Sequence, residues 1–589
     1  MSKQSYPKKS TWSDPSQSQK DKLDRFEKLS RGASQSGGDQ PQPAVLLKVL
    51  NDKSVTGFDP SPYLHGPLQK EGNTPENKAR ILIELSHYRR TGKMNVFWEK
   101  CQQEAAAIDP FYKNNFRGVN FVIPVLVPSD SEMPFFQNSV ILSDPDDCQH
   151  IARAHIKKQP NFSALLFQSL IATTDNVHWA KQRNYLNEVF LPQSSLSKIF
   201  PTSWKRAKFC ANKLATMSTN AGPYGVQMHD FFLHEAQAQL QLALFGMDEA
   251  FMEETNVQIR DVFAGVHKDP KGGFGSKMVL DMLKKVGENE NFGAPTDPDV
   301  INGTKALFGP LSKAVHNAAT DLDMNIYDQF GNMMLILFAG HDTTAHTMTW
   351  CAYELAHHPH YQRRVQQEVD ALFAALNGKD MVYEDCVKLP FLTKCVMETL
   401  RLWTAVPNGT FRELQYDDEV RGPGGKMVTL KKGTFVQVCN LMRQRNVTLW
   451  GKDAEEFNPD REWQGNEIWG MSDATNPTPY HGSNPNSPRF SPFTFTPRDC
   501  LGKNFAQMEM RTILANVFHR FNLELSAPYS DVNVKKNGGL ECTGATMGPM
   551  DMTPEGLETT RQRMAGLAQP NKPKMAMYLH AVPRARTKL

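Results

Sequence analysis

The chain has 589 residues, more than one packed core requires, so it holds either several domains or one large domain with tails and insertions. Lysine and arginine outnumber aspartate and glutamate by only 66 to 63, a balance that argues against a nucleic-acid surface or a polyanionic substrate. The nine scattered cysteines indicate buried thiols in a reducing compartment rather than a disulfide framework. Partners must therefore be inferred from individual sites.

The N-terminal segment, residues 1–75, is rich in Ser, Gln, Pro, Gly and Lys, and predicts a disordered arm. The segment lacks the apolar stretch of a secretory signal. Its acidic residues argue against an organelle transit peptide, but they do not exclude one. No apolar run reaches the ~20 residues that span a bilayer. We therefore expect a cytoplasmic protein without a transmembrane anchor, whose main domain extends over residues 76–589.

Apolar residues recur at spacings of three and four along much of this domain, which is typical of long helices. The clearest helices are expected at residues 227–246, 327–358, 359–376 and 391–403. Alternating patterns predict short strands at 426–440 and 573–582. Two stretches rich in helix breakers, near 464–492 and 530–572, are interpreted as surface loops or insertions. The sequence thus predicts a mainly α body with a minor β region.

Two pairs of residues lie one helical turn apart, so that each pair shares one helix face. The first is Trp179 and Arg183 in the sequence HWAKQR, and the second is Glu398 and Arg401 in ETLR. Trp and Arg at this spacing often only stack on a surface. An exposed Glu–Arg pair is worth less than ~1 kcal/mol. Neither pair alone indicates a function.

The helix expected at 327–358 contains the sequence FAGHDTTAH at 338–346. Gly340 in a helix interior costs about 1 kcal/mol relative to alanine. Asp342 and Thr343 compete with the helix for backbone hydrogen bonds. A segment that served helix stability alone would avoid this cluster, so it indicates a function. The simpler alternative is a polar notch in a packed helix.

A single cysteine, Cys500, lies in the sequence FTFTPRDCLGKNFAQ at 493–507, directly before a predicted helix. The positive N-terminal end of that helix favours a thiolate. Arg498 is suited to meet an anion, Phe493 to shield one side, and Gly502 to let a flat group approach the backbone. A cysteine in such a turn is more often a plain buried thiol.

This segment resembles the cysteine-ligand loop of the cytochrome P450 family, whose signature is F-x-x-G-x-R-x-C-x-G. Phe493, Arg498, Cys500 and Gly502 match it. Thr496 stands where the family normally has glycine, which the turn accommodates if the φ of Thr496 is negative. The other motifs precede this loop in the family's order, so that the resemblance covers the chain from residue 179 to about residue 518.

The resemblance implies a P450 fold, with haem b between the long helix and the Cys500 loop. Cys500 would ligate the iron as a thiolate, with Asp342 as the acid and Thr343 as the hydroxyl that relay protons towards dioxygen. The other residues implied to bind the haem are Trp179, Arg183, Arg412, Phe493, Arg498 and Gly502. The residues implied to form a buried structural triad are Glu398, Arg401 and Arg461.

The implied activity is insertion of one oxygen atom from O2 into a small organic molecule by hydroxylation or epoxidation. Phe338, Ala339, Val406 and part of 543–550 are expected to face the substrate, and their small or apolar side chains favour a lipophilic or neutral molecule. Only about 70 residues follow residue 518, so the electrons are expected from a separate ferredoxin or flavoprotein reductase.

Two alternatives stay open at this point, a peroxide-using haem-thiolate enzyme and a non-catalytic haem-binding protein on the same fold. The pair Asp342 and Thr343 counts against both, because neither alternative requires it. No histidine pattern competes with the cysteine as an iron ligand. His178, His341 and His346 are therefore interpreted as neutral lining or surface residues.

Overall fold

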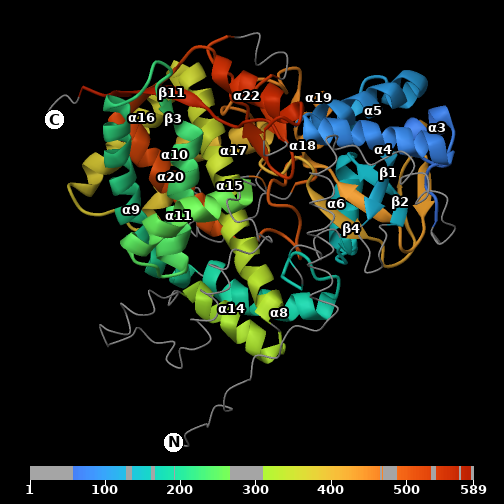
Figure 1. The fold of residues 1–589 in the computed structure, drawn as a ribbon, viewed down its shortest axis with the longest axis horizontal. Helices are drawn as coiled ribbons and strands as arrows, with labels where there is room; N and C mark the ends of the chain where they lie inside the picture. The colour runs from blue at the N-terminus through green and yellow to red at the C-terminus, as the bar shows by residue number, and fades with distance from the viewer. Residues whose placement is uncertain are drawn as a thin grey trace, which may run out of the picture.

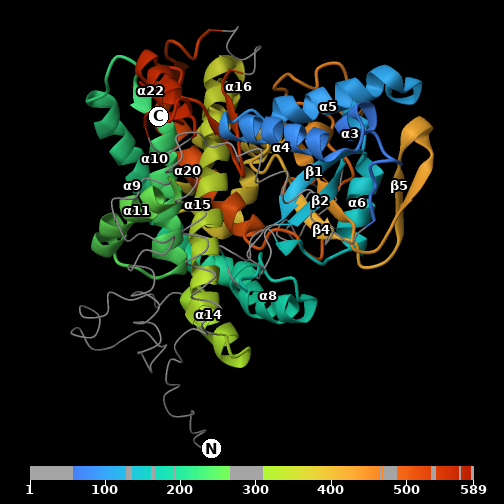
Figure 2. The ribbon, with the colours of Figure 1, turned by 45° about the vertical axis from the view of Figure 1, so that its right-hand side comes forward.

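The computed structural model describes residues 58–127, 135–160, 166, 168–191, 193–264, 310–324, 326–464, 467, 487–531, 539–568 and 572–585. These residues form a mainly helical body beside a smaller β region (Figures 1 and 2). The helices are α3 (Pro67–Glu71), α4 (Pro75–Arg90), α5 (Met94–Ile108), α6 (Pro145–Ala154), α8 (Asn176–Phe190), α9 (Gln193–Thr219), α10 (Met228–Gln239), α11 (Glu249–Ala264), α14 (Pro310–Asp321), α15 (Ile326–His357), α16 (Pro359–Leu376), α17 (Pro390–Leu402), α18 (Asn440–Gln444), α19 (Val447–Trp450), α20 (Lys503–Arg520) and α22 (Pro554–Met564).

The strands are short, as the sequence predicts. They are β1 (Phe121–Val127), β2 (Phe135–Leu142), β3 (Val226–Gln227), β4 (Thr410–Glu413), β5 (Asp418–Arg421), β6 (Met427–Leu430), β7 (Phe435–Val438), β8 (Phe521–Leu525), β9 (Glu541–Thr543), β10 (Met547–Pro549) and β11 (Tyr578–Pro583). The patterns at 426–440 and 573–582 correspond to β6 with β7 and to β11. The predicted mainly α class is confirmed.

The four helices expected from periodicity are present. Residues 359–376 form α16, which begins with a proline at its first position and ends before Asn377, whose φ of 48° lies in the left-handed region. Residues 391–403 correspond to α17, and 327–358 to α15. The stretch 227–246 forms α10 followed by a π-helical turn, Leu240–Leu244. The apolar spacing therefore locates these helices to within a few residues.

Helix α15 runs through the middle of the molecule, with α9, α10 and α11 on one side and the sheet of β1, β2 and β4 on the other (Figures 1 and 2). It packs against α10. At the π-helical turn, Leu240 lies against Gly340, and a Cβ on that glycine would come within 2.9 Å of the Leu240 methyl carbons. Close packing of two helices therefore explains why position 340 holds glycine.

The largest sheet has the strand order β1-β2-β7-β4. Strands β1 and β2 are antiparallel, β2 and β7 are parallel, and β4 and β7 are antiparallel. Strand β4 carries Arg412, opposite Val436 of β7. A second sheet joins β3, β11 and β8. Among the residues that the structure describes, no helix has both the length and the apolar character that crossing a bilayer demands.

The predicted boundary of the arm at residue 75 is wrong, because order begins before it. Leu64 and Leu68 are fully buried, and His65 forms a bridge with Phe121 at the start of β1. The His65 Nε2 atom also lies 2.8 Å from Asp109. A few apolar residues thus anchor this polar segment to the sheet. Residues 1–57 lie outside the described residues, and the prediction for them stays a prediction.

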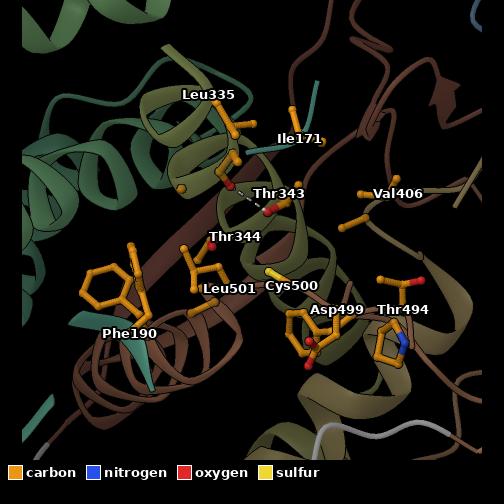
Figure 3. Close-up of a pocket in the computed structure, with 18 of the residues that line it drawn as sticks. Ile171, Phe190, Leu335, Thr343, Thr344, Val406, Thr494, Asp499, Cys500 and Leu501 are labelled. Atoms are coloured by element: carbon orange, nitrogen blue, oxygen red, sulfur yellow. Dashed lines mark hydrogen bonds between the residues drawn. The ribbon is translucent and has the colours of Figure 1, made fainter. Parts of the chain in front are cut away.

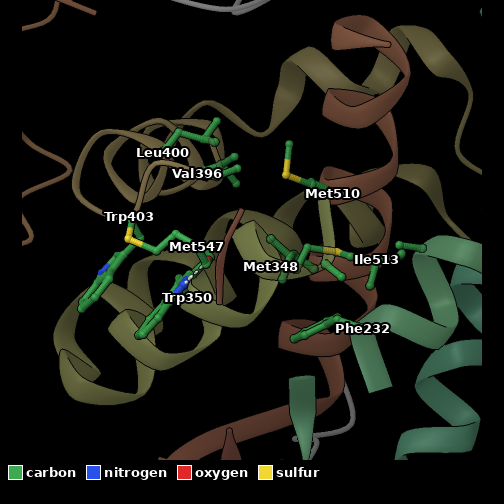
Figure 4. Close-up of a cluster of buried hydrophobic side chains, with 14 of the residues drawn as sticks. Phe232, Met348, Trp350, Val396, Leu400, Trp403, Met510, Ile513 and Met547 are labelled. Carbon is green, nitrogen blue, oxygen red and sulfur yellow. Dashed lines mark hydrogen bonds between the residues drawn. The ribbon is translucent and has the colours of Figure 1, made fainter. Parts of the chain in front are cut away.

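The interpretation of 530–572 as a surface insertion is also wrong for its described part. Strands β9 and β10 form a buried hairpin there, and α22 follows it. The Trp350 Nε1 atom of α15 donates to the Met547 carbonyl at 3.1 Å (Figure 4). Trp350 in turn stacks on Trp403 with 3.8 Å between the ring centroids. The hairpin is therefore part of the core.

Most of the second predicted insertion, 464–492, lies outside the described residues. Of its described part, Glu467 and Phe490 are fully buried, and Glu467 pairs with Arg489 at 2.8 Å. These anchors hold the two ends of the segment against the body of the protein.

Candidate active site

A cavity of about 320 Å³ lies between α15 and the loop that precedes α20. Figure 3 shows the Cys500 sulfur and the Thr343 hydroxyl among its lining side chains, the first from the loop and the second from α15. The rest of the wall is mostly apolar. It includes Ile171, Phe190, Leu240, Leu335, Ile336, Leu400, Ala405, Val406, Phe493 and Phe505. Segments that are far apart in the sequence thus meet around one apolar space.

Cys500 differs from the other cysteines of the chain. All nine are free thiols, and Cys500 is exposed whereas the other eight are buried. Its exposed surface faces the cavity. Burial among the surrounding side chains raises the pKa of the Cys500 thiol, and Lys503 opposes this only in part. A metal cation bound to the sulfur would supply the charge that holds it as a thiolate.

The backbone of the loop accommodates the departure from the family signature. The Cys500 N–H donates to the Phe493 carbonyl at 2.9 Å and closes the loop. The positive φ in this loop is found at Thr494, at 59°, and not at Thr496. Position 496 therefore does not require glycine in this turn. Helix α20 begins at Lys503, so the sulfur lies just before its N-terminal end.

Four cationic side chains gather at the edge of the cavity. Lys158, Arg183 and Arg498 line it, and Arg412 lies fully buried behind them. The Arg183 guanidinium is paired with Asp499 at 3.0 Å. The Nε and Nη2 atoms of Arg412, and the Nε and Nη1 atoms of Arg498, are buried without a hydrogen-bond partner among the described residues. Such groups indicate an anionic ligand.

The pKa values of these cations report the same excess of positive charge. Burial and then the neighbouring Arg498 lower the pKa of Arg412 to about 9. Burial and then Arg183 lower the pKa of Arg498 to about 10. Burial, Arg412 and Arg498 lower the pKa of Lys158 well below its usual value. A ligand with two carboxylates would relieve this repulsion, and the haem group, with its two propionates, fits the donor set.

Trp179 belongs to the same edge. Its ring lies 4.5 Å from the guanidinium carbon of Arg498, within cation–π range. Trp179 and Arg183 both come from α8 and both line the cavity, as one helical turn between them allows. The predicted haem-binding residues therefore come together around one space, although Arg412 reaches it only from behind.

The predicted acid and hydroxyl face different sides of α15. The Thr343 hydroxyl lines the cavity and donates to the Ala339 carbonyl at 3.1 Å. Asp342 does not line the cavity, and its Oδ2 atom lies 3.7 Å from Nδ1 of His346. One residue along a helix turns a side chain by about 100°. Adjacent positions therefore cannot both point at one small molecule without rearrangement.

The expected substrate contacts are met in part. Ala339 and Val406 line the cavity. Phe338 is not among the lining residues, and neither is any residue of 543–550. The hairpin of β9 and β10 instead supports the wall from behind, since the Met547 N–H donates to the carbonyl of Ala405 at 3.0 Å. The expectations for Phe338 and for the hairpin are therefore corrected.

Glu398, Arg401 and Arg461 are in contact and buried, away from the cavity wall. Arg401 donates to both carboxylate oxygens of Glu398 at 2.8 Å, and both side chains are fully buried. The Arg461 Nε atom donates to Glu398 at 2.9 Å. Arg401 also donates to the carbonyls of Gln444 and Ala454. The interpretation as an exposed ion pair is therefore excluded.

Sequence reasoning missed several residues of the cavity wall, among them Lys158 and Leu240. The Lys158 Nζ atom lies 2.6 Å from the Thr410 hydroxyl. Its neighbour Lys157 pairs instead with Glu413, also at 2.6 Å. Nothing local in the sequence HIKKQP separates the two lysines. The position of Leu240 in the wall could be predicted only by knowing that α10 changes to a π-helical turn.

Part of the chain is similar to known proteins. Residues 311–540 match the family model described as Cytochrome P450. That segment contains Thr343, Glu398 and Cys500, whereas Trp179 and Lys158 lie outside it.

Three curated relatives illustrate the similarity. The chain is 33% identical to Cytochrome P450 27C1 of Danio rerio over 226 residues, which is 38% of this chain and 37% of the relative. It is 33% identical to Cytokinin hydroxylase of Arabidopsis thaliana over 221 residues, 36% of this chain and 37% of the relative. It is 33% identical to Cytochrome P450 monooxygenase sphH of Aspergillus fumigatus over 244 residues, 41% and 40% respectively. The chain thus spans about two fifths of the length of these relatives.

Proposed function

Because the chain belongs to the cytochrome P450 family, we propose that it is a haem-thiolate monooxygenase. It inserts one oxygen atom from O2 into a lipophilic or neutral small molecule by hydroxylation or epoxidation. A separate ferredoxin or flavoprotein reductase supplies the electrons. The observation that carries this proposal is the exposed Cys500 in an apolar cavity, opposite the Thr343 hydroxyl and beside buried guanidinium nitrogens that have no hydrogen-bond partner among the described residues.

The proposed cofactor is haem b. Cys500 would hold the iron, with Phe493 beside it and Gly502 leaving room for a flat ring. Arg412 and Arg498 would bind the propionates, together with the remaining residues of the cationic edge, which are Lys158, Trp179 and Arg183. When bound, the haem supplies the redox chemistry that activates dioxygen. The chain would orient the haem and the substrate and exclude water from the cavity.

The substrate class is proposed from the cavity wall. Ile171, Leu335 and Val406 present apolar side chains on the side of the cavity where Thr343 lies (Figure 3). An apolar wall with few polar groups favours a lipophilic or neutral molecule. Two of the relatives are named as a hydroxylase and a monooxygenase, which supports oxygen insertion as the reaction.

The test of this proposal is an absorption spectrum of the purified protein, reduced under carbon monoxide. A thiolate-ligated haem shows a Soret band at longer wavelength than a nitrogen-ligated haem, and we expect the red-shifted band here. Failure to take up haem, or a spectrum of nitrogen ligation, would refute the proposal. Product formed with peroxide but not with a reductase system would instead support a peroxide-using enzyme.

Replacing Thr343 with alanine should uncouple electron consumption from product formation. The variant loses the cavity hydroxyl that orders proton delivery, so that the electrons end in released peroxide. We expect product per electron pair to fall by about one to two orders of magnitude, while reductant consumption changes little. The measurement is the ratio of product, peroxide and reductant consumed.

Thr349→Ala is the matched control for this variant. Thr349 lies on the same helix and makes the same type of hydroxyl-to-carbonyl bond, to Ala345 at 2.7 Å, but it does not line the cavity. Coupling should stay at the wild-type value in this control. Equal coupling in Thr343→Ala and Thr349→Ala would show that the Thr343 hydroxyl has no part in proton delivery.

A further inference from the structure

Three buried histidines surround Asp342 on the side of α15 that faces away from the cavity. His229 comes from α10, and His341 and His346 come from α15. They expose 4%, 2% and 0% of their surface, respectively. The interpretation of His341 and His346 as cavity-lining or surface residues is therefore wrong. Buried imidazoles without a structural role are unusual, so each nitrogen atom needs an explanation.

One of the three histidines has a structural explanation. The His341 Nδ1 atom donates to the Leu337 carbonyl at 2.6 Å, which fixes its ring against its own helix. The other two do not. Both ring nitrogens of His346, and Nε2 of His229, are buried without a hydrogen-bond partner among the described residues. The same holds for Oδ2 of Asp342.

These unpartnered atoms lie next to one another. His346 Nδ1 is 3.7 Å from Asp342 Oδ2, slightly longer than a direct hydrogen bond and short enough for a small rotation or a bridging water to close. The rings of His346 and His229 stack with 5.0 Å between centroids and 15° between planes. Asp342, His346 and His229 therefore form a continuous row from α15 to α10.

The outer end of this row approaches the surface. His229 lies at the start of α10 and is followed by Asp230, whose side chain is about half exposed. Asp230 pairs with Arg260 of α11 at 2.5 Å. The inner end of the row is Asp342, which directly precedes Thr343 on α15. The row thus extends from His229, buried beneath the surface of α10 and α11, to the helix position next to Thr343.

We propose that His346 and His229 form a proton relay that supplies Asp342 from the α10 and α11 surface. This inference rests on the proposed monooxygenase function, which consumes protons. A proton passes from solvent to His229, then through a bridging water to His346, because the stacked rings do not hydrogen-bond to each other directly, and from His346 to Asp342. Each donor is restored by the next group outward, so one proton moves inward and no electron moves. Both histidines act through Asp342 and are positioning residues.

The charge states of the row suit this task. Burial lowers the pKa of His346 and His229, which leaves both imidazoles neutral near pH 7. For Asp342 burial raises the pKa, but His346 and His341 outweigh it and the net shift is downward, so the group is a carboxylate. A carboxylate beside neutral imidazoles can accept a proton. The other charged or polar groups that face the row are Arg260 of α11, Thr546 of the β9–β10 hairpin and Lys572.

The first test is turnover of the reconstituted His346→Gln variant. We expect product per electron pair to fall about tenfold, with a matching rise in peroxide and a larger solvent isotope effect. Because bulk water must then replace the relay, the coupling of this variant should fall as pH rises, whereas wild-type coupling should stay level across neutral pH. His229→Gln should show the same trend and provides a second variant if His346→Gln folds poorly.

His358→Gln is the matched control. His358 directly follows the same helix, four residues after Glu354, and its Nδ1 is 3.4 Å from that carboxylate. The variant thus removes an imidazole from an equivalent acid–histidine pair that is far from Asp342 in the sequence of α15. Coupling and its pH dependence should equal those of the wild type.

A second readout does not depend on turnover. Infrared difference spectra across pH follow protonation of the Asp342 carboxyl, whose band is assigned by its loss in Asp342→Asn. In His346→Gln we expect Asp342 to bind its proton at a higher pH than in the wild type, because the nearby imidazole that lowers its pKa is gone. His358→Gln should leave this titration unchanged.

The outcomes separate the relay from the proposed function. A normal red-shifted carbon monoxide band, together with unchanged coupling and unchanged Asp342 titration in both relay variants, would overturn the relay alone. A wild-type protein without that band would overturn the proposed function and the relay with it. A pH-dependent loss of coupling in both variants, with a shifted Asp342 titration in His346→Gln, would support the relay.

Discussion

Replacing Cys500 with serine removes the red-shifted Soret band and reduces monooxygenase turnover to background. A serine hydroxyl stays protonated at neutral pH, so it cannot supply the anionic ligand that the thiol supplies. The cationic edge of the cavity is unchanged in this variant, so some haem should still bind, with an altered spectrum. The measurements are the carbon monoxide difference spectrum and product formation with a reductase system.

Cys439→Ser is the control for this prediction. Cys439 is fully buried, and its Sγ lies 3.5 Å from the Pro407 carbonyl, a contact that a serine hydroxyl can replace. Both the spectrum and turnover should be retained. A red-shifted band that persisted in Cys500→Ser would mean that another group ligates the iron, and the assignment of the cavity as the haem site would fail.

Replacing Glu398 with alanine should destabilise the fold by about 3–5 kcal/mol. The carboxylate accepts two hydrogen bonds from Arg401, one from Arg461 and one from the Asn458 N–H. Its loss leaves the fully buried Arg401 guanidinium without a counter-charge, which costs more than the pair itself contributes. Urea unfolding followed by tryptophan fluorescence should show the transition at a clearly lower denaturant concentration.

The surface offers a pair of the same spacing for comparison. Glu558 and Arg561 are also three residues apart and in contact, but both side chains are largely exposed. Glu558→Ala should therefore leave the unfolding transition where it is in the wild type. Similar shifts in Glu398→Ala and Glu558→Ala would show that burial does not set the cost of breaking these pairs.

Features that depend on local spacing could be predicted from the sequence. Glu398 and Arg401 share a helix face because three residues make nearly one turn, and the structure has them in contact. Cys500 precedes a helix because Gly502 ends the turn that leads into it. The long apolar period likewise located α15. In each case the interacting residues are close in the chain, so their geometry follows from the local conformation.

Features that depend on distant partners could not be predicted. Leu64 and Leu68 lie in a polar segment, and their order comes from packing against β1 and its neighbours. The Met- and Gly-rich hairpin became core because Met547 meets Trp350, some two hundred residues earlier. The surroundings of Asp342 could not be predicted for the same reason. Its neighbour His346 stacks on His229, which comes from another helix.

Leu240 and Gly340 form one part of the cavity wall. This part indicates where the range of accepted substrates can be widened. Any side chain added at position 340 would collide with the leucine methyl groups. A shorter residue at position 240 would instead enlarge the cavity towards α10. Position 240 lies in the π-helical turn, which already departs from regular α-helical hydrogen bonding. Engineering for bulkier compounds should therefore begin on α10 and leave the central helix intact.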